Sequence, residues 1–321
     1  IDILEPLPNK TPEAKEAYQK ATYFRGLEYY NERAFPNALS MFLRSGNFPQ
    51  DSEIHALSTY WMAESMYELR KYGEAVKTFE KFLTMPAAQK TDVYNFANYA
   101  LGYAAFEDEK YTKAANYFEK FLNGNDKDAK TVTDATIRLA DAYFVNKNYR
   151  DAMVYYNKII NGKLTGEDYA LFQRGMIQGL EKQDDAKITT MQSLLSKFPN
   201  SNYADDAGFE TAYTYFNKGD FDKSKSDLVD LVAKYPRSSY VPRALVTIGL
   251  VQYNQDQDEM ALESFKKVIR DYASSPEAKQ ALESIKNIYI DQGDANGFIA
   301  YAGTTPLGHY SMSEQDNIVF Q

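Results

Sequence analysis

GYAAFEDEKYTKAANYF, residues 102–118, carries the spacing that decides the fold. Gly102 is followed twelve residues later by Ala114, and four residues after that by Phe118. This pattern of two small residues and one bulky residue recurs at seven places, with 35 to 39 residues between them. Such a period is typical of a solenoid, in which each repeat packs only against its neighbours. The seven triplets are Gly26/Ala38/Phe42, Ala63/Ala75/Phe79, Gly102/Ala114/Phe118, Ala140/Ala152/Tyr156, Gly175/Lys187/Met191, Ala212/Ser224/Leu228 and Gly249/Ala261/Phe265.

Each triplet predicts two helices, helix A and helix B, joined by a short turn. Small residues are needed where the two helices cross, because larger side chains would separate the axes by more than about 8–10 Å. We expect the bulky third residue to fill the groove between repeats. Gly219 in the sixth repeat supplies the left-handed conformation that ends helix A. Five turns carry an aromatic residue nine positions after the first small one: Phe35, Tyr72, Tyr111, Tyr149 and Phe221.

The fifth repeat departs from the pattern, because Lys187 occupies its second small position. We expect the lysine stem to extend toward solvent and the packing there to be looser. The preceding loop, residues 161–168, is the predicted boundary between two parts. The predicted organisation is an N-terminal extension (1–11), repeats one to four (12–160), repeats five to eight (161–302), and a linker with the start of a further helix (303–321). Ser313 and Asp316 are expected to cap that helix, and both ends suggest a segment of a longer protein.

The composition argues against several classes of function. The net charge of −9 and a pI of about 5.0 make a nucleic acid an improbable partner. The chain has no cysteine, so it has neither disulfides nor thiolate metal sites, and it has no apolar run of 18 residues. His55 and His309 are predicted to be plain surface residues, and the acidic stretches 123–128 and 256–259 to be solvated turns. No nucleophile, nucleotide-binding or metal motif occurs, so we predict no enzyme, no cofactor and no metal.

The small–x11–small–x3–aromatic spacing, with Pro199 and Pro236 eight residues after the third position, resembles the tetratricopeptide repeat (TPR) pattern over residues 12–302. The resemblance implies an all-α, right-handed superhelical solenoid of antiparallel helix pairs, with seven to eight repeats. The linkers 198–201 and 235–238 are similar to those of periplasmic TPR proteins of Gram-negative envelopes. This similarity implies the periplasm or cell envelope, with the cytoplasm as the alternative.

In TPR solenoids, helix A lines a concave groove with positions 5, 9, 12 and 13 of the repeat. The resemblance therefore implies a set of partner-binding residues: Tyr23, Tyr30, Tyr60, Glu64, Tyr67, Tyr99, Tyr103, Phe106, Asp141, Tyr213 and Asn217. The alternative is that these rings pack against one another, which we favour for position 12. For Tyr60, Tyr99 and Tyr103 we favour contact with a partner, because tyrosine offers a large ring and a polar tip.

We predict a non-catalytic scaffold that binds a protein or peptide along helix A. TPR domains that grip a C-terminal carboxylate use Lys and Asn at positions 5 and 9. Neither residue type occurs at these positions, so no carboxylate clamp is expected. Two alternatives are a carbohydrate-binding protein of the envelope and the scaffold part of a larger enzyme. Self-association through the end repeats is a further possibility.

Overall fold

The computed structural model describes residues 1, 4–6, 9–125, 128–308 and 310–320. In this described part the chain forms seventeen α-helices and one short 3₁₀-helix, η1 (Ala88–Lys90), and no strand. The chain divides into two compact units, Ile1–Ala170 (unit 1) and Leu171–Gln321 (unit 2). The division falls inside α9 (Glu167–Leu180), shortly after the loop at which we placed a boundary.

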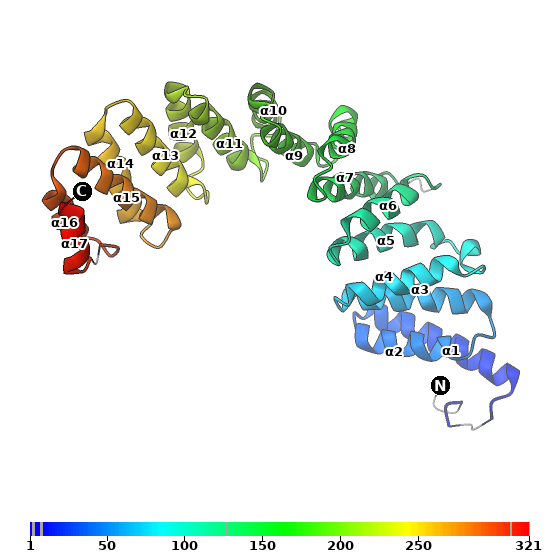
Figure 1. Ribbon diagram of the computed structural model, residues 1–321. Helices are drawn as coiled ribbons and strands as arrows, with labels where there is room; N and C mark the ends of the chain where they lie inside the picture. The colour runs from blue at the N-terminus through cyan, green and yellow to red at the C-terminus, as the bar shows by residue number, and fades with distance from the viewer. Residues whose placement is uncertain (2–3, 7–8, 126–127, 309, 321) are drawn as a thin grey trace. The chain divides into compact units, whose positions relative to one another are not determined.

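The helices form successive pairs along the chain (Figure 1). In unit 1 each helix from α1 to α7 packs against the next one, and in unit 2 each helix from α10 to α16 does so. The predicted all-α architecture of paired helices is confirmed. Unit 1 contains α1 (Pro12–Asn31), α2 (Phe35–Gly46), α3 (Ser52–Glu68), α4 (Tyr72–Thr84), α5 (Tyr94–Glu107), α6 (Tyr111–Leu122), α7 (Ala129–Val145) and α8 (Tyr149–Gly162). Unit 2 contains α10 (Asp184–Lys197), α11 (Ala204–Asn217), α12 (Phe221–Lys234), α13 (Val241–Asn254), α14 (Asp258–Asp271), α15 (Pro276–Asp291), α16 (Ala295–Ala302) and α17 (Met312–Val319).

Helix A ends in the same way in every repeat, with one residue in the left-handed conformation. Its φ lies between 55° and 77°, the geometry that lets the turn satisfy the last carbonyl groups of the helix. The sequence pattern identified this residue only at Gly219. Gly293 follows at the same spacing, which places an eighth repeat in register. The eight residues are Arg33, Arg70, Glu109, Lys147, Lys182, Gly219, Asp256 and Gly293.

In three of the triplets a phenylalanine ring packs directly on a glycine of helix A. A Cβ atom on Gly102 would lie 2.7 Å from Cε1 of Phe118, and one on Gly249 would lie 2.6 Å from Cε1 of Phe265. Such distances are too short for a real Cβ atom, so these rings keep their positions only because helix A has glycine there. The bulky third residue therefore packs on helix A of its own repeat, whereas we had placed it between repeats.

Lys187 does not extend into solvent, and the prediction that it does so is wrong. The residue is 8% exposed, and its Nζ donates to Oε2 of Glu210 at 2.5 Å. A Cβ on Gly179 would lie 3.0 Å from Cδ of Lys187, so the lysine stem runs along helix A of its own repeat. The carboxylate of the following repeat compensates the buried charge, which explains why a lysine is tolerated in this position.

The remaining sequence expectations concern the chain end and isolated residues. Helix α17 is capped by Ser311 and Glu314, two residues earlier than predicted: the Ser311 backbone N–H donates to the Glu314 carboxylate at 2.7 Å. His55 is half-buried and burial lowers its pKa, so it is no plain surface residue. His309 lies outside the described residues, as do positions 126 and 127 of one acidic stretch.

The described residues contain no group of three or more His, Cys, Asp or Glu side chains that could hold a metal ion. None of the described helices combines the length and apolar character that crossing a membrane requires.

Candidate functional site

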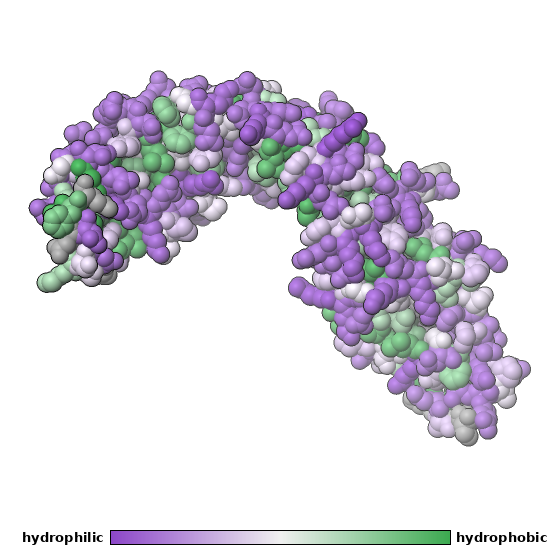
Figure 2. All heavy atoms as spheres, in the orientation of Figure 1, coloured by the Kyte–Doolittle hydropathy of each residue, from purple (hydrophilic) through white to green (hydrophobic). Residues whose placement is uncertain are grey.

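Helix A of each repeat in unit 1 packs against helix A of the next: α1 on α3, α3 on α5, and α5 on α7. We call the surface formed by these four helices the helix-A face. It carries most of the predicted partner-binding residues. In the view of Figure 2, hydrophobic atoms on unit 1 lie in separate patches among hydrophilic side chains. Binding to such a surface depends on polar as well as apolar contacts.

A cavity of about 210 Å³ lies between α3 and α5 on the helix-A face. Ligand pockets for drug-sized molecules usually measure about 300–1,000 Å³, so this cavity has room for a single side chain rather than a larger ligand. Four of its lining residues are among the predicted partner-binding residues. The lining consists of Glu64, Tyr67, Phe96, Tyr99, Ala100 and Tyr103.

The Glu64 carboxylate lacks strong hydrogen-bond donors within the protein. Its Oε2 accepts one long hydrogen bond, 3.5 Å, from the Tyr30 hydroxyl, and its Oε1 is buried without a hydrogen-bond partner. Burial raises the pKa of Glu64 to about 6, Glu68 adds to the rise, and the hydroxyls of Tyr60 and Tyr30 oppose it. Buried polar atoms are nearly always paired, so this one calls for a physical reason.

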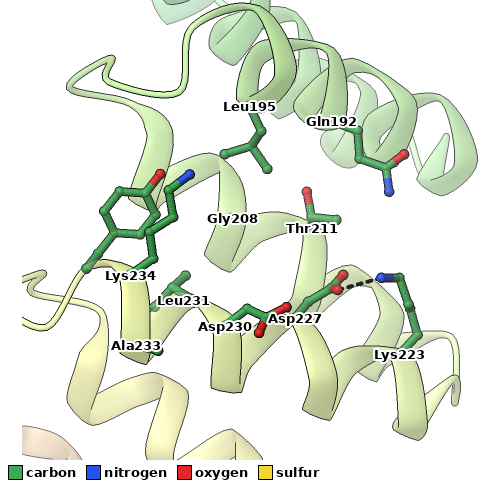
Figure 3. Close-up of a pocket in the computed structure, with 11 residues that line it drawn as sticks. Gln192, Leu195, Gly208, Thr211, Lys223, Asp227, Asp230, Leu231, Ala233 and Lys234 are labelled. Atoms are coloured by element: carbon green, nitrogen blue, oxygen red, sulfur yellow. Dashed lines mark hydrogen bonds and ion pairs between the residues drawn. The ribbon is translucent and has the colours of Figure 1, made fainter.

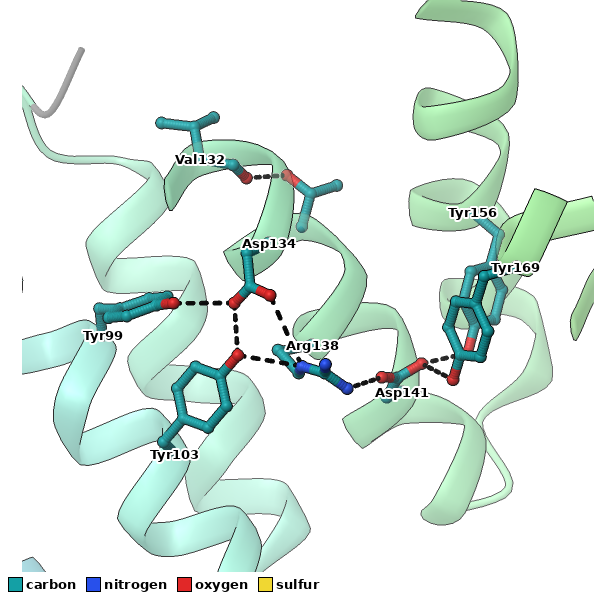
Figure 4. A network of polar contacts seen from close by, with 9 residues as sticks. Tyr99, Tyr103, Val132, Asp134, Arg138, Asp141, Tyr156 and Tyr169 are labelled. Atoms are coloured by element: carbon teal, nitrogen blue, oxygen red, sulfur yellow. Dashed lines mark hydrogen bonds and ion pairs between the residues drawn. The ribbon is translucent and has the colours of Figure 1, made fainter. Parts of the chain in front are cut away.

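A hydrogen-bond network fixes one wall of the cavity (Figure 4). The Asp134 carboxylate on α7 accepts hydrogen bonds from Tyr99, at 2.8 Å, and from Tyr103. Nε of Arg138 donates to the Tyr103 hydroxyl at 3.0 Å. Burial and the Asp134 carboxylate raise the pKa of Tyr99 and of Tyr103, so both hydroxyls remain protonated donors. The two rings are thereby held in place before any partner arrives.

The network continues to Asp141, which is 5% exposed. Its Oδ2 accepts from Nη1 of Arg138 at 3.0 Å, and its Oδ1 from the hydroxyls of Tyr156 at 2.7 Å and Tyr169 at 2.8 Å. Asp141 therefore ties α7 to α8 and α9 rather than facing a partner. Our sequence analysis missed Asp134 and Arg138, although their i, i+4 spacing of opposite charges on a helix was a usable signal.

Two predicted residues belong to the core. Tyr60 is 3% exposed, and its ring lies between Phe79 and Phe82, at centroid distances of 5.7 and 5.5 Å. Tyr23 is 7% exposed and packs with Ala38. Both rings are enclosed by the fold, so neither offers a partner a large contact area.

In five repeats the aromatic residue at position 12 packs on the aromatic residue that begins helix B of the same repeat. The ring centroids of Tyr67 and Tyr72 are 5.5 Å apart. Each ring thus stabilises its own turn, and Tyr67 also lines the cavity. The equivalent pairs are Tyr30/Phe35 at 5.3 Å, Phe106/Tyr111 at 5.2 Å, Phe144/Tyr149 at 5.8 Å and Phe216/Phe221 at 5.8 Å.

The last two predicted residues, Tyr213 and Asn217, lie on α11 in unit 2. The Tyr213 ring stacks on Phe209 at 5.6 Å with an interplanar angle of 16°, and Phe209 stacks on Tyr240 at 4.7 Å. The Arg243 guanidinium lies 5.1 Å from the Tyr213 ring. Tyr213 thus takes part in a stack within unit 2, and Asn217 is exposed at the end of α11.

Unit 2 also contains a larger cavity, of about 630 Å³, lined by α10, α11 and α12 (Figure 3). Three of its charged side chains, Lys223, Asp227 and Lys234, have partners within the same wall. Lys223 Nζ donates to Asp227 at 2.6 Å, and the Lys234 ammonium lies 5.0 Å from the Tyr235 ring. We therefore regard the smaller cavity of unit 1, with its unpaired carboxylate oxygen, as the stronger candidate site.

Paired helices, a small–small–bulky triplet in most pairs and a left-handed residue at each turn define a TPR-type helical repeat protein. A tetratricopeptide repeat model matches residues 60–130 and 99–165, and a family described as outer membrane lipoprotein matches residues 170–292. These matches and the fold support a tetratricopeptide repeat protein that resembles bacterial envelope members of this family. Among curated protein sequences, none is significantly similar to it.

Solved structures share the fold at low sequence identity. The C-terminal part of a TPR repeat-containing protein from Cytophaga hutchinsonii is 15% identical, with a TM-score of 0.63, and the match covers 81% of this chain and 98% of that one. A tetratricopeptide repeat protein from Parabacteroides merdae is also 15% identical, with a TM-score of 0.51 and coverage of 85% and 97%. The fold supports a protein-interaction scaffold.

Proposed function

We propose that this protein is a non-catalytic scaffold that binds a segment of a partner protein on the helix-A face of unit 1. The observation that carries the proposal is the cavity between α3 and α5, which combines fixed tyrosine rings with a carboxylate oxygen that the protein leaves unpaired. Tyrosine rings supply large contact area at a low cost in side-chain entropy, and they dominate many protein interfaces.

The wall formed by Tyr99 and Tyr103 is suited to binding because it is already ordered. Both hydroxyls are bound to Asp134, so a partner does not have to immobilise these rings. Preorganisation of this kind raises affinity by lowering the entropy lost on association. The acidic wall also disfavours a partner that offers a C-terminal carboxylate, in agreement with the absence of Lys and Asn at positions 5 and 9.

We further propose that the scaffold works in the bacterial cell envelope. The match of residues 170–292 to an outer membrane lipoprotein family and the similar linkers at 198–201 and 235–238 support this location. Fractionation of the source cells into cytoplasm, periplasm and membranes tests it. Recovery of the protein with the cytoplasmic fraction alone contradicts the proposal.

Selection of random peptides on the purified full chain tests the binding surface. Peptides that bind wild type should lose at least about tenfold in affinity when Tyr67→Ala removes one wall of the cavity. Tyr117→Ala is the matched control, because Tyr117 is also half-buried in unit 1 but lies on helix B, in α6. Circular dichroism checks that both variants fold. Equal affinities for wild type and the folded Tyr67→Ala variant place the binding surface elsewhere.

A further inference from the structure

Glu64 is a buried acid that its own chain does not satisfy. Its Oε1 has no hydrogen-bond partner, although the side chain lines a cavity that opens on the helix-A face. Asp141, at the equivalent position of the fourth repeat, accepts three hydrogen bonds from within the protein. The contrast indicates that the missing donor for Glu64 comes from outside the chain.

The chemistry of the cavity decides which donor fits. The rings of Tyr67, Phe96, Tyr99 and Tyr103 line it, and aromatic faces attract cations. A lysine ammonium carries three donors and an arginine guanidinium five, with no acceptor that would repel the carboxylate. An apolar side chain would leave Oε1 unpaired, and an acidic side chain would be repelled.

We infer that the cavity between α3 and α5 is a pocket for one basic side chain, lysine or arginine, of the partner segment, with Glu64 as its counter-ion. The inference rests on the proposed function, because the basic side chain belongs to the segment that the helix-A face binds. The volume of about 210 Å³ agrees with one inserted side chain.

The charges around the cavity favour a basic guest. Glu68 on α3 and Glu107 on α5 are exposed carboxylates near its rim, and Glu107 contributes to the raised pKa of Tyr67. The nearby cation, Arg138, is held between Asp134 and Asp141. The net charge of −9 also speeds the approach of a basic segment.

Peptide selection on two forms of the full chain tests the pocket. Peptides selected on wild type should share a lysine or arginine at one position, and Glu64→Gln should lower their affinity by about tenfold or more. Glu263→Gln is the control. It removes the same charge from an exposed side chain on α14 in unit 2, outside the cavity and its rim, and it should change the affinity less than about threefold.

The outcomes separate this inference from the proposed function. The pocket assignment is wrong if peptides bind the helix-A face without a shared basic residue, or if they bind Glu64→Gln as tightly as wild type. Neither result contradicts the proposed function. If no peptide binds, or if Tyr67→Ala leaves the peptide affinity unchanged, the proposed function is wrong.

A small probe tests the pocket without any peptide. In a titration followed by NMR, n-butylammonium should shift resonances of α3 and α5, and n-butanol, which has a similar shape and no charge, should not. Glu64→Gln should abolish the ammonium-dependent shifts, and Glu263→Gln should retain them. Shifts that are equal for the two probes, or that persist in Glu64→Gln, rule out a counter-ion role for Glu64.

Discussion

Glu64 in the second repeat and Asp141 in the fourth occupy the same place, directly after the first small residue of helix A. Both carboxylates are largely enclosed, but their surroundings differ. Asp141 is bound by Arg138, Tyr156 and Tyr169, whereas Glu64 accepts one long hydrogen bond from Tyr30, and the Tyr60 hydroxyl also favours its charged form. At the same repeat position, Asp141 therefore holds neighbouring helices together, whereas Glu64 remains available to a partner.

Part of the difference comes from one atom of the triplet, the hydroxyl oxygen of its third residue. The third position of the fourth repeat is Tyr156, whose hydroxyl reaches Asp141 at 2.7 Å. In the second repeat the third position is Phe79, which is fully buried and has no hydroxyl to offer Glu64. A phenylalanine at this position thus leaves the carboxylate above it without the donor that the tyrosine provides.

Of the substitutions that test this comparison, removal of the Asp141 side chain should lower the free energy of unfolding most. Asp141→Ala leaves the Tyr156 hydroxyl, the Tyr169 hydroxyl and one Arg138 N–H without their acceptor. Breaking a buried ionic network of this kind costs about 3–5 kcal/mol of unfolding free energy. Urea denaturation followed by circular dichroism measures it. Asp141→Asn keeps an acceptor oxygen and should lose less. A loss below about 1 kcal/mol for Asp141→Ala means that the network does not hold these repeats together.

Loss of the Tyr156 hydroxyl should make the fourth repeat resemble the second. Tyr156→Phe removes one hydrogen bond to a charged acceptor, and such a bond contributes about 1.5–3 kcal/mol. Tyr155→Phe is the control, because the neighbouring hydroxyl lies 3.4 Å from Glu119 in a half-buried setting and should contribute less. Equal urea midpoints for the two variants contradict the role assigned to Tyr156.

The triplet spacing was sufficient to predict the helix pairs because its residues interact within one repeat, over a separation of 16 positions. The steric fit of Phe118 against Gly102 is such a local contact. The exposure of a helix-A side chain is different, because it depends on residues of other elements. Tyr60 matches the groove pattern in sequence, yet Phe79 and Phe82 enclose it.

The sequence pattern also did not predict which polar residues of neighbouring repeats pair with each other. Lys187 departs from the small-residue rule, and only the structure shows that Glu210 of the next repeat pairs with it. Tyr99 binds Asp134 across 35 residues of chain. Of the candidate site, the sequence supplied Glu64, Tyr67, Tyr99 and Tyr103. The bonds that fix two of these rings depend on how neighbouring repeats are stacked, which a single repeat does not encode.

Glu64→Gln should stabilise the protein near neutral pH. The pKa of Glu64 is raised from an ordinary 4.5 to about 6, so the folded state holds its proton more tightly than the unfolded state. The carboxyl is neutral in both states below about pH 4.5, and its burial becomes unfavourable as the pH rises through 6. The difference amounts to about 2 kcal/mol at pH 7.5.

Urea denaturation at several pH values measures this effect. The free energy of unfolding of Glu64→Gln should equal that of wild type near pH 4.5 and should exceed it increasingly between pH 4.5 and 7. Glu263→Gln, a control at an exposed position of α14, should stay within about 0.5 kcal/mol of wild type throughout. A gain that does not depend on pH contradicts the raised pKa. Together with weaker binding of basic peptides, the predicted gain would show that Glu64 is retained for binding at the expense of stability.

The smallest effect is expected from Tyr99→Phe, which keeps the ring in the cavity wall and removes only its hydroxyl. Asp134 would still accept from Tyr103 and lie beside Arg138, so the loss should be about 0.5–1.5 kcal/mol. Peptide affinity should fall less than about threefold, because the contact area of the ring is unchanged. Tyr99→Ala, which deletes the ring, should weaken binding by about tenfold or more. If Tyr99→Phe weakens binding as much as Tyr99→Ala, the hydroxyl itself contacts the partner, and the network with Asp134 has to open on binding.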